Sequence, residues 1–272
     1  LFPYTTLFRS STLDQFCIDR RTGPRNMCVD EERLGVSPNS IEWFEAFVAF
    51  TKRGNLHAGL LLREESGGIV AYHQAWNNIT TYQRLADFIK DYRSGVVTAR
   101  PIMKPVRLRA AAKWCVLNAA SGEQYAYALQ LDPNAYIDER GKLVSDSANG
   151  LSCVTFVLAI FKSLGIGAID LSGWPERSED AVLHRYVVHS LRDSMNRNEP
   201  GFSAEYVSRV SGEIGCIRVR PEELIGGIAS SPYAASPQQA ISAGRFVRGM
   251  LFGLSVANGI RPAKFPPSEP WL

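Results

Sequence analysis

The chain has 272 residues, of which 45% are hydrophobic, 21% are charged and 10% are aromatic. This balance is typical of a globular protein with an ample core, and it excludes a disordered chain. The formal net charge is only +3 and no block of Lys and Arg occurs, so we expect no nucleic-acid partner. No apolar run reaches the roughly 20 residues that span a bilayer, so we expect no transmembrane segment.

The two ends of the chain are predicted to lie outside the main domain. The first ten residues, LFPYTTLFRS, match the in-frame translation of a sequencing adapter, and we interpret residues 1–10 as an adapter-derived artefact. Residues 11–40 are polar and are predicted to form an irregular N-terminal extension, and residues 231–272 a C-terminal extension. Because no Met precedes Met27, the natural N-terminus and any signal peptide could lie outside this sequence, and export stays open.

The cysteines do not form a recognisable framework. They are odd in number, they form no C-x-x-C pair and none lies at zinc-ligand spacing from a histidine: Cys17, Cys28, Cys115, Cys153 and Cys216. We therefore expect reduced thiols, a cytoplasmic location, no metal and no organic cofactor.

The predicted elements alternate between strands and helices. The apolar run at 41–50 fits either a helix or a strand. Residues 57–62 and 69–76 flank a short loop that contains Gly, which predicts a β-hairpin. Helices are predicted over 81–92, 105–118, 153–164, 179–192 and 204–214 and from Pro221, and strands over 124–131, 142–144 and 216–219. A single α+β domain over 41–230 is the simplest arrangement.

The helix at 153–164 has the clearest signals. Ser152 is a good N-cap, Gly165 is a typical helix stop, and apolar residues cover nearly the whole circumference, so we expect this helix to be buried. Cys153 would lie in its first turn, where the helix dipole favours a thiolate and free N–H groups can hold an oxyanion. Cys153 is therefore the candidate nucleophile.

Two histidines on the predicted hairpin could serve this thiol. If the loop runs from Arg63 to Gly67, Leu62 opposes Gly68 and His57 falls opposite His73 on one face. One imidazole could then fix the tautomer of the other, with His57 as the base and His73 as the orienting residue. A two-residue turn would instead misalign the pair.

Other polar residues are interpreted as structural. His184 and His189 are five residues apart, so they do not share a helix face as metal ligands would, and we expect surface or packing roles. The charged group near the end of the domain is predicted to be a solvated face: Arg218, Arg220, Glu222 and Glu223.

The order of these motifs resembles the circularly permuted papain-like fold of the NlpC-type hydrolases and the lecithin–retinol acyltransferase group. The matching pieces are His57–Leu60, Tyr72–His73, Gly122–Tyr125 and Asn149–Val157, within roughly residues 55–165. The resemblance implies an antiparallel sheet packed on a central buried helix that bears the cysteine, with 41–230 as the catalytic domain. It assigns the nucleophile, base and orienting roles to Cys153, His57 and His73. The asparagine is not adjacent to the cysteine, which departs from the pattern.

The resemblance implies a thiol-dependent hydrolase that cleaves an amide or peptide bond through an acyl-enzyme. An acyltransferase or thioesterase of the lecithin–retinol type is the alternative reaction. A non-catalytic binding module on the same fold is the alternative class. The substrate would be a peptide, an amide or another acyl compound, and the substrate-binding residues and the oligomeric state stay open.

Overall fold

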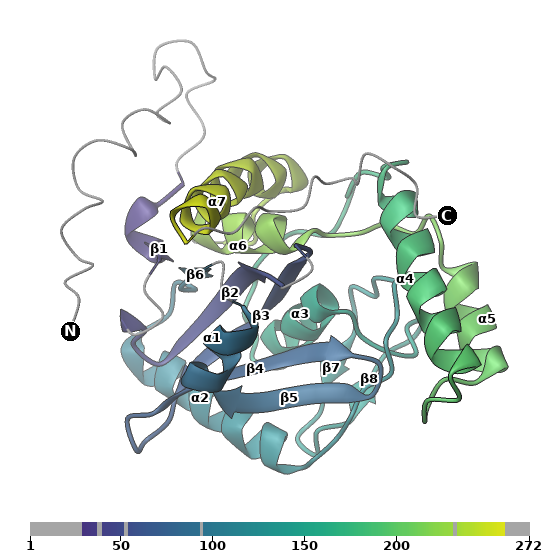
Figure 1. Cartoon of the computed structure of the whole chain (residues 1–272). Coiled ribbons are helices and arrows are strands. Elements are labelled where there is room, and N and C mark those ends of the chain that lie inside the picture. The colour runs from purple at the N-terminus through teal and green to yellow at the C-terminus, as the bar shows by residue number, and fades with distance from the viewer. Residues whose placement is uncertain (1–28, 37–39, 52–53, 93–94, 231–232, 259–272) are drawn as a thin grey trace, which may run out of the picture.

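A computed structural model describes residues 29–36, 40–51, 54–92, 95–230 and 233–258. Its centre is a six-stranded antiparallel sheet with the strand order β1-β6-β2-β3-β4-β5 (Figure 1). The strands are β1 (Leu34–Gly35), β2 (Phe44–Phe50), β3 (Leu56–Arg63), β4 (Ile69–Trp76), β5 (Ile79–Arg84) and β6 (Val96–Ala99). A short 3-10 helix, Glu31–Arg33, precedes β1, and a second small sheet pairs β7 (Tyr136–Ile137) with β8 (Leu143–Val144).

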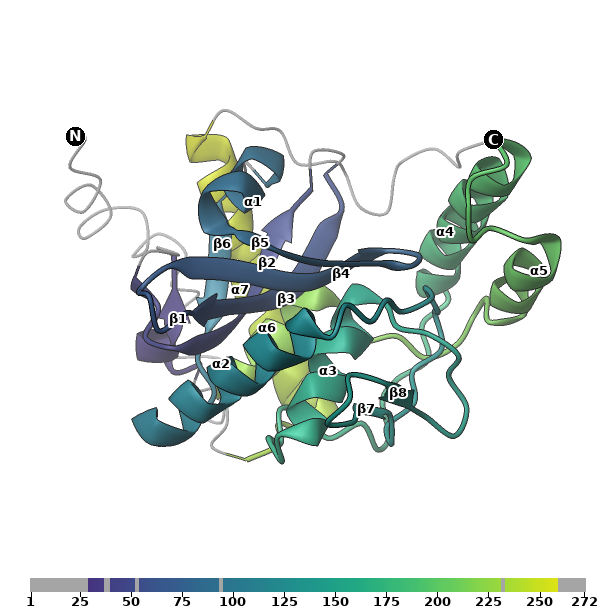
Figure 2. The same ribbon diagram turned by 90° about the horizontal axis from the view of Figure 1, so that it is seen from below.

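Helices cover the two faces of the large sheet unequally. They are α1 (Leu85–Asp91), α2 (Pro105–Ala120), α3 (Cys153–Ser163), α4 (Asp180–Asn196), α5 (Ala204–Gly212), α6 (Pro221–Ser230) and α7 (Pro237–Ala257). Figure 2 shows α1 on one side of the sheet, with α2 and α3 on the other. The main core also takes in α6 and α7, whereas α4 and α5 pack together around a separate cluster. The predicted α+β class is confirmed.

The period-2 alternation of the strands sorts their side chains between these two sides. Along β3, Ala58, Leu60 and Leu62 point into the main core with α3. Leu61 belongs to the smaller core under α1, and the ring of His57 packs against aromatic side chains of that smaller core. Successive residues of β3 therefore face the main core and the smaller core in turn.

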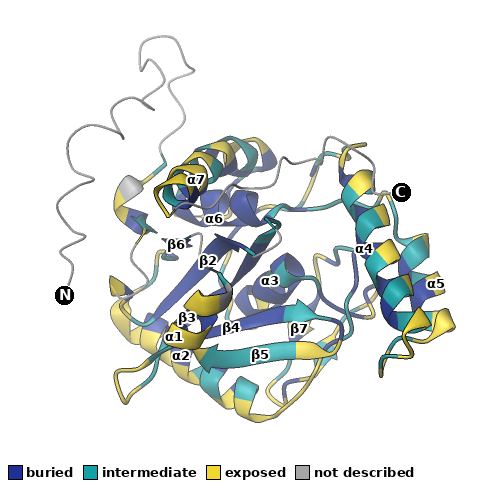
Figure 3. Ribbon diagram, viewed as in Figure 1, coloured by how far each residue is buried: buried dark blue, intermediate teal, exposed yellow. Residues whose placement is uncertain are grey.

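Helix α3 is buried and capped as the sequence predicts. The Ser152 side chain accepts a hydrogen bond from the Thr155 N–H, and the Thr155 hydroxyl accepts one from the Ser152 N–H, which completes a capping box. Gly165 has a φ of +64°, the left-handed conformation that ends a helix without strain. Figure 3 shows α3 as one of the most buried helices, whereas α1 and α7 expose their outer faces.

Three sequence predictions of secondary structure are wrong. Residues 81–92 are divided between β5 and α1, because Thr81 and Tyr82 pair with β4 across the sheet. Residues 124–131 form no strand, since their main chain bonds to side chains: Tyr125 O accepts from the Gln74 amide, and Glu213 accepts from the N–H groups of residues 129 and 130. Residues 216–219 are likewise outside any strand.

The domain also extends beyond 41–230 in the structure. Helix α7, predicted to lie in a C-terminal extension, packs on α6 so closely that a Cβ on Gly226 would lie 2.4 Å from the Gly244 nitrogen. Its Val247 and Leu251 are fully buried in the main core. At the other end, β1 pairs with β6 through Leu34 and Ala99. The proposed artefact at 1–10, together with Cys17 and Cys28, lies outside the described residues.

By length and composition alone, α7 could cross a membrane, and it is the one helix in the described ranges that meets this test. A third of its most apolar stretch, 33%, is buried inside the fold, and helices of a protein core pass the same test.

Candidate active site

The β3–β4 hairpin brings His57 and His73 together on one face, as predicted. The register differs from the predicted one by two residues: Leu62 opposes Val70, the loop is residues 64–68, and His73 therefore lies across from Gly59. The imidazoles meet on the diagonal, with 3.0 Å between His57 Nε2 and His73 Nδ1. A Cβ on Gly59 would lie 2.6 Å from the His73 Cβ, so a glycine is what lets the two rings approach across the strand.

Aromatic side chains enclose the two histidines. The Tyr92 ring stacks on His57 with 5.4 Å between centroids, and the Phe88 ring meets the edge of His73 at 5.6 Å. Phe47 lies against both imidazoles. Burial, together with the charge that His73 could carry, holds the pKa of His57 well below its ordinary value. His57 is therefore neutral near pH 7 and able to accept a proton.

Gln83 on β5 completes a chain of hydrogen-bonding groups behind His57. Its side-chain amide lies 3.3 Å from His73 Nε2. If His57 Nε2 donates to His73 Nδ1, then His73 carries its own proton on Nε2, and this N–H needs an acceptor. The side-chain carbonyl of Gln83 provides the acceptor when the Gln83 amide is rotated so that its oxygen and nitrogen exchange places. This arrangement leaves His57 Nδ1 as a basic lone pair, with no hydrogen-bond partner among the described residues.

Cys153 begins α3 on the other side of β3, beside the residue that follows His57. Burial raises the pKa of the Cys153 thiol, while the Ala58 N–H and the Arg218 guanidinium act in the opposite direction, as do the N–H groups at the start of α3. The net shift is upward, so the resting protein holds a neutral thiol. The N–H groups at the start of α3 favour the thiolate, as expected, but burial outweighs them.

Cys153 thus lies beside β3 on the side of the main core, whereas the rings of His57 and His73 lie on the other side of the sheet. In the described residues, no hydrogen bond joins the Cys153 Sγ to His57 or His73. Cys153 as a whole residue is partly exposed. The β3 main chain separates the Cys153 sulfur from the imidazole pair, so a proton can pass between them only through an intermediate group such as water.

The charged cluster at the start of α6 differs from the solvated face that the sequence predicts. Asp180 is only 2% exposed and pairs with Arg177, Arg218 and Arg220 at 2.9–3.3 Å. Arg177 also donates to Glu223, which is buried. Because these charges satisfy one another, they can be buried, and the network holds Arg218 close to Cys153.

The remaining histidines and cysteines have structural surroundings. His184 is fully buried, and its Nδ1 accepts from the Gly215 N–H at 3.2 Å. His189 is exposed and lies 3.6 Å from Asp193. Cys115 is buried in the main core. Among the described residues, no group of three or more His, Cys, Asp or Glu side chains could hold a metal ion.

Sequence reasoning missed several residues of this site. Gln83 and Tyr92 fall in a segment interpreted as one helix, although the alternation of Thr81 and Gln83 is a strand signal that could have placed Gln83 beside His73. Arg218 was assigned to a solvated face, and nothing in its sequence context indicates contact with α3.

A scan against family models finds no match to this chain, and searches of the curated proteins and of the solved structures also find no match.

Proposed function

We propose that this protein is a thiol-dependent hydrolase on a permuted papain-like fold, with Cys153 as nucleophile, His57 as base and His73 as the orienting residue. The observation that carries the proposal is the 3.0 Å hydrogen bond between His57 Nε2 and His73 Nδ1, on the strand against which Cys153 lies. A second observation supports it: the ring nitrogen left over, His57 Nδ1, is the one free to take the thiol proton.

The reaction follows from these groups. Because His57 and Cys153 lie on opposite faces of β3, the proposal requires a water molecule to carry the thiol proton to His57 Nδ1 as Sγ attacks the carbonyl carbon of the substrate. The Ala58 N–H and the N–H groups at the start of α3 stabilise the oxyanion, because they already favour negative charge at this place. The imidazolium then protonates the leaving amine, and water, activated by the same ring, releases the acyl group as an acid.

The neutral resting pair has a consequence for the substrate. A thiol and an imidazole that are both neutral must transfer a proton within the reaction, and this suits a poor leaving group such as an amine, which needs the proton back. Amide or peptide hydrolysis is therefore the reaction that we propose. Transfer of the acyl group to an amine or thiol is the alternative, and it would use the same acyl-enzyme.

A non-catalytic binding module is favoured by two observations: the upward shift of the Cys153 pKa, and the placement of Cys153 and the two histidines on opposite faces of β3. An acylation experiment separates the two functions. We expect p-nitrophenyl acetate to acetylate Cys153 once per chain in a burst of p-nitrophenolate, with the site identified by mass spectrometry. Cys153→Ala should abolish the burst and Cys216→Ala, which changes another partly accessible thiol, should retain it. A burst that persists in Cys153→Ala, or no acetylation of Cys153 in the unaltered protein, would refute the enzyme proposal.

A further inference from the structure

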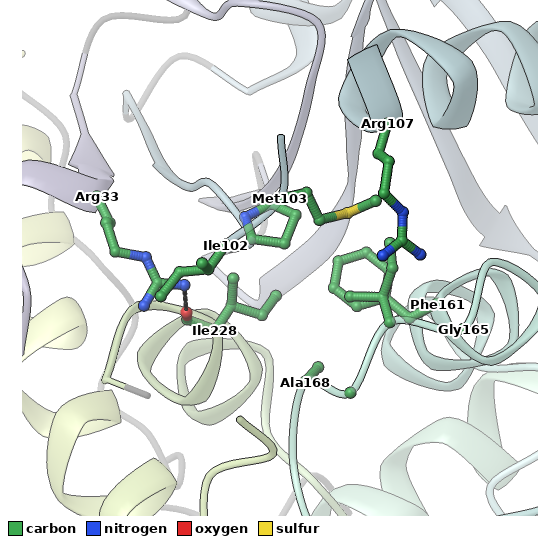
Figure 4. Close-up of a pocket in the computed structure, with 11 residues that line it drawn as sticks. Arg33, Ile102, Met103, Arg107, Phe161, Gly165, Ala168 and Ile228 are labelled. Atoms are coloured by element: carbon green, nitrogen blue, oxygen red, sulfur yellow. Dashed lines mark hydrogen bonds between the residues drawn. The ribbon is translucent and has the colours of Figure 1, made fainter. Parts of the chain in front are cut away.

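A pocket lies at the end of α3 opposite to Cys153. It has a volume of about 150 Å³ and is enclosed by the start of α2, the segment before it, the end of α3 and α6 (Figure 4). Its apolar walls come from Ile102, Met103, Phe161 and Ile228. An 11-residue helix is roughly 16 Å long, so this pocket is separate from the candidate active site.

Arg107 brings an unsatisfied positive charge to this pocket. It is exposed in the first turn of α2, and in Figure 4 its side chain reaches toward Phe161 and Gly165. Within the described ranges, its guanidinium makes no hydrogen bond or ion pair. None of the described lining residues is acidic, and the first turn of α2 also has no acidic residue. The guanidinium is thus a planar donor whose partner is not supplied by the surrounding walls.

Two further features of the walls favour an anion. Arg33, only 8% exposed, carries a second positive charge, fixed in place by hydrogen bonds to the carbonyl oxygens of Arg100, Ile228 and Ala229. Across from it, the main-chain N–H groups of Gly167 and Ala168 donate no hydrogen bond in the part of the chain that the structure describes. These N–H donors and guanidinium groups suit a ligand that accepts hydrogen bonds.

We propose that this pocket binds a small organic carboxylate, independently of the proposed hydrolase activity. The carboxylate would pair with the fork of Arg107, which matches its two oxygens. The apolar body would lie against Ile102, Met103, Phe161 and Ile228. A cavity of this volume holds a body of about six carbon atoms, the size of a benzene ring. Arg33 already donates to three main-chain carbonyl oxygens, which leaves the Arg107 guanidinium to pair with a carboxylate and favours a monoanion.

Benzoate is a suitable probe, because it combines a single carboxylate with a six-carbon ring, and benzamide is its neutral counterpart. Calorimetric titration of the full chain should show benzoate binding at millimolar concentration and benzamide binding more weakly. Arg107→Gln should weaken benzoate binding at least about tenfold, as expected for the loss of a charged hydrogen-bonding pair.

Two controls locate the site. Arg109→Gln changes an arginine of the same helix that instead contacts Glu65 and the Trp43 ring, and it should leave benzoate affinity unchanged. Cys153→Ala should also bind benzoate normally, which separates this pocket from the active site. Benzoate that does not bind at all, or that binds Arg107→Gln as tightly as the unaltered protein, would overturn the proposal.

Discussion

The two sides of the sheet hold the residues of the candidate active site in different ways. Cys153 belongs to a helix packed into the main core, with Phe156 and Phe161 close to fully buried behind it. His57 and His73 lie on the other side, under a single short helix and a small aromatic cluster. The proposed nucleophile is thus held by the bulk of the fold and the proposed base by a thin cover, so changes on the two sides should affect stability and reactivity differently.

The largest effect is expected on the side of the main core. Phe161 is 1% exposed and its ring lies 5.6 Å from that of Phe44. Phe161→Ala should lower the free energy of unfolding by about 3–5 kcal/mol, because it leaves a cavity that the surrounding helices cannot fill. Urea denaturation would measure the change. A loss below about 1 kcal/mol would contradict the assignment of this side as the main source of stability.

The matched change on the histidine side is Phe88→Ala. Phe88 is on α1, the helix that covers this side of the sheet in the described residues, and its ring contacts Phe47, His73 and Tyr92. We expect a smaller loss of about 2–3 kcal/mol, because this cover can collapse into the space. Water would then reach the imidazoles, so the pKa of His57 should move up toward its ordinary value. The acylation of Cys153 at pH 6 should fall in Phe88→Ala relative to pH 8, a change in profile that Phe161→Ala should not show.

Acid should destabilise the protein through its buried histidines. Burial lowers the pKa of His57, and it lowers that of His184 to about 4. The unfolded chain takes up protons near pH 6.5 while these folded rings stay neutral, so stability is complete above pH 6.5 and is lost as the pH falls toward 4. The slope should approach about 1.4 kcal/mol per pH unit for each histidine.

Denaturant titrations between pH 7 and 5 test this dependence before most carboxylates protonate. His184→Gln should make the slope shallower, and the exposed variant His189→Gln should not. Stability that is constant across this range would show that the buried imidazoles take up protons in the folded protein at the same pH as in the unfolded chain.

The smallest effect is expected at Gln83, which contacts the orienting histidine. Gln83→Leu removes the acceptor for His73 Nε2 and should slow the acylation of Cys153 by roughly tenfold, about 1.4 kcal/mol, with little change in stability. Gln83→Glu keeps an acceptor and should restore most of the rate. Equal rates in all three proteins would remove Gln83 from the chain of hydrogen bonds.

Local signals were enough to predict the parts of this fold that depend on neighbouring residues. Ser152 and Gly165 predicted both ends of α3, and the two apolar runs predicted the hairpin that joins His57 to His73. The register was wrong by two residues, because the position of the loop depends on pairing across the whole hairpin. Long-range packing was not predictable. Helix α7 owes its place to a close approach of Gly226 and Gly244, and the buried partner of Arg218, Asp180, comes from α4.

The most direct test of the site is alkylation of Cys153 by iodoacetamide across pH 5–9, followed residue by residue by mass spectrometry. Cys216, whose pKa is raised to about 11, serves as the slow internal reference. We predict that Cys153 is alkylated faster than Cys216 at pH 7, and that its rate falls only well below pH 6.5, where His57 takes up a proton. The variant His57→Gln should abolish the faster alkylation of Cys153, and His189→Gln should retain it. A Cys153 rate that is the same with and without His57 would contradict the assignment of His57 as its base.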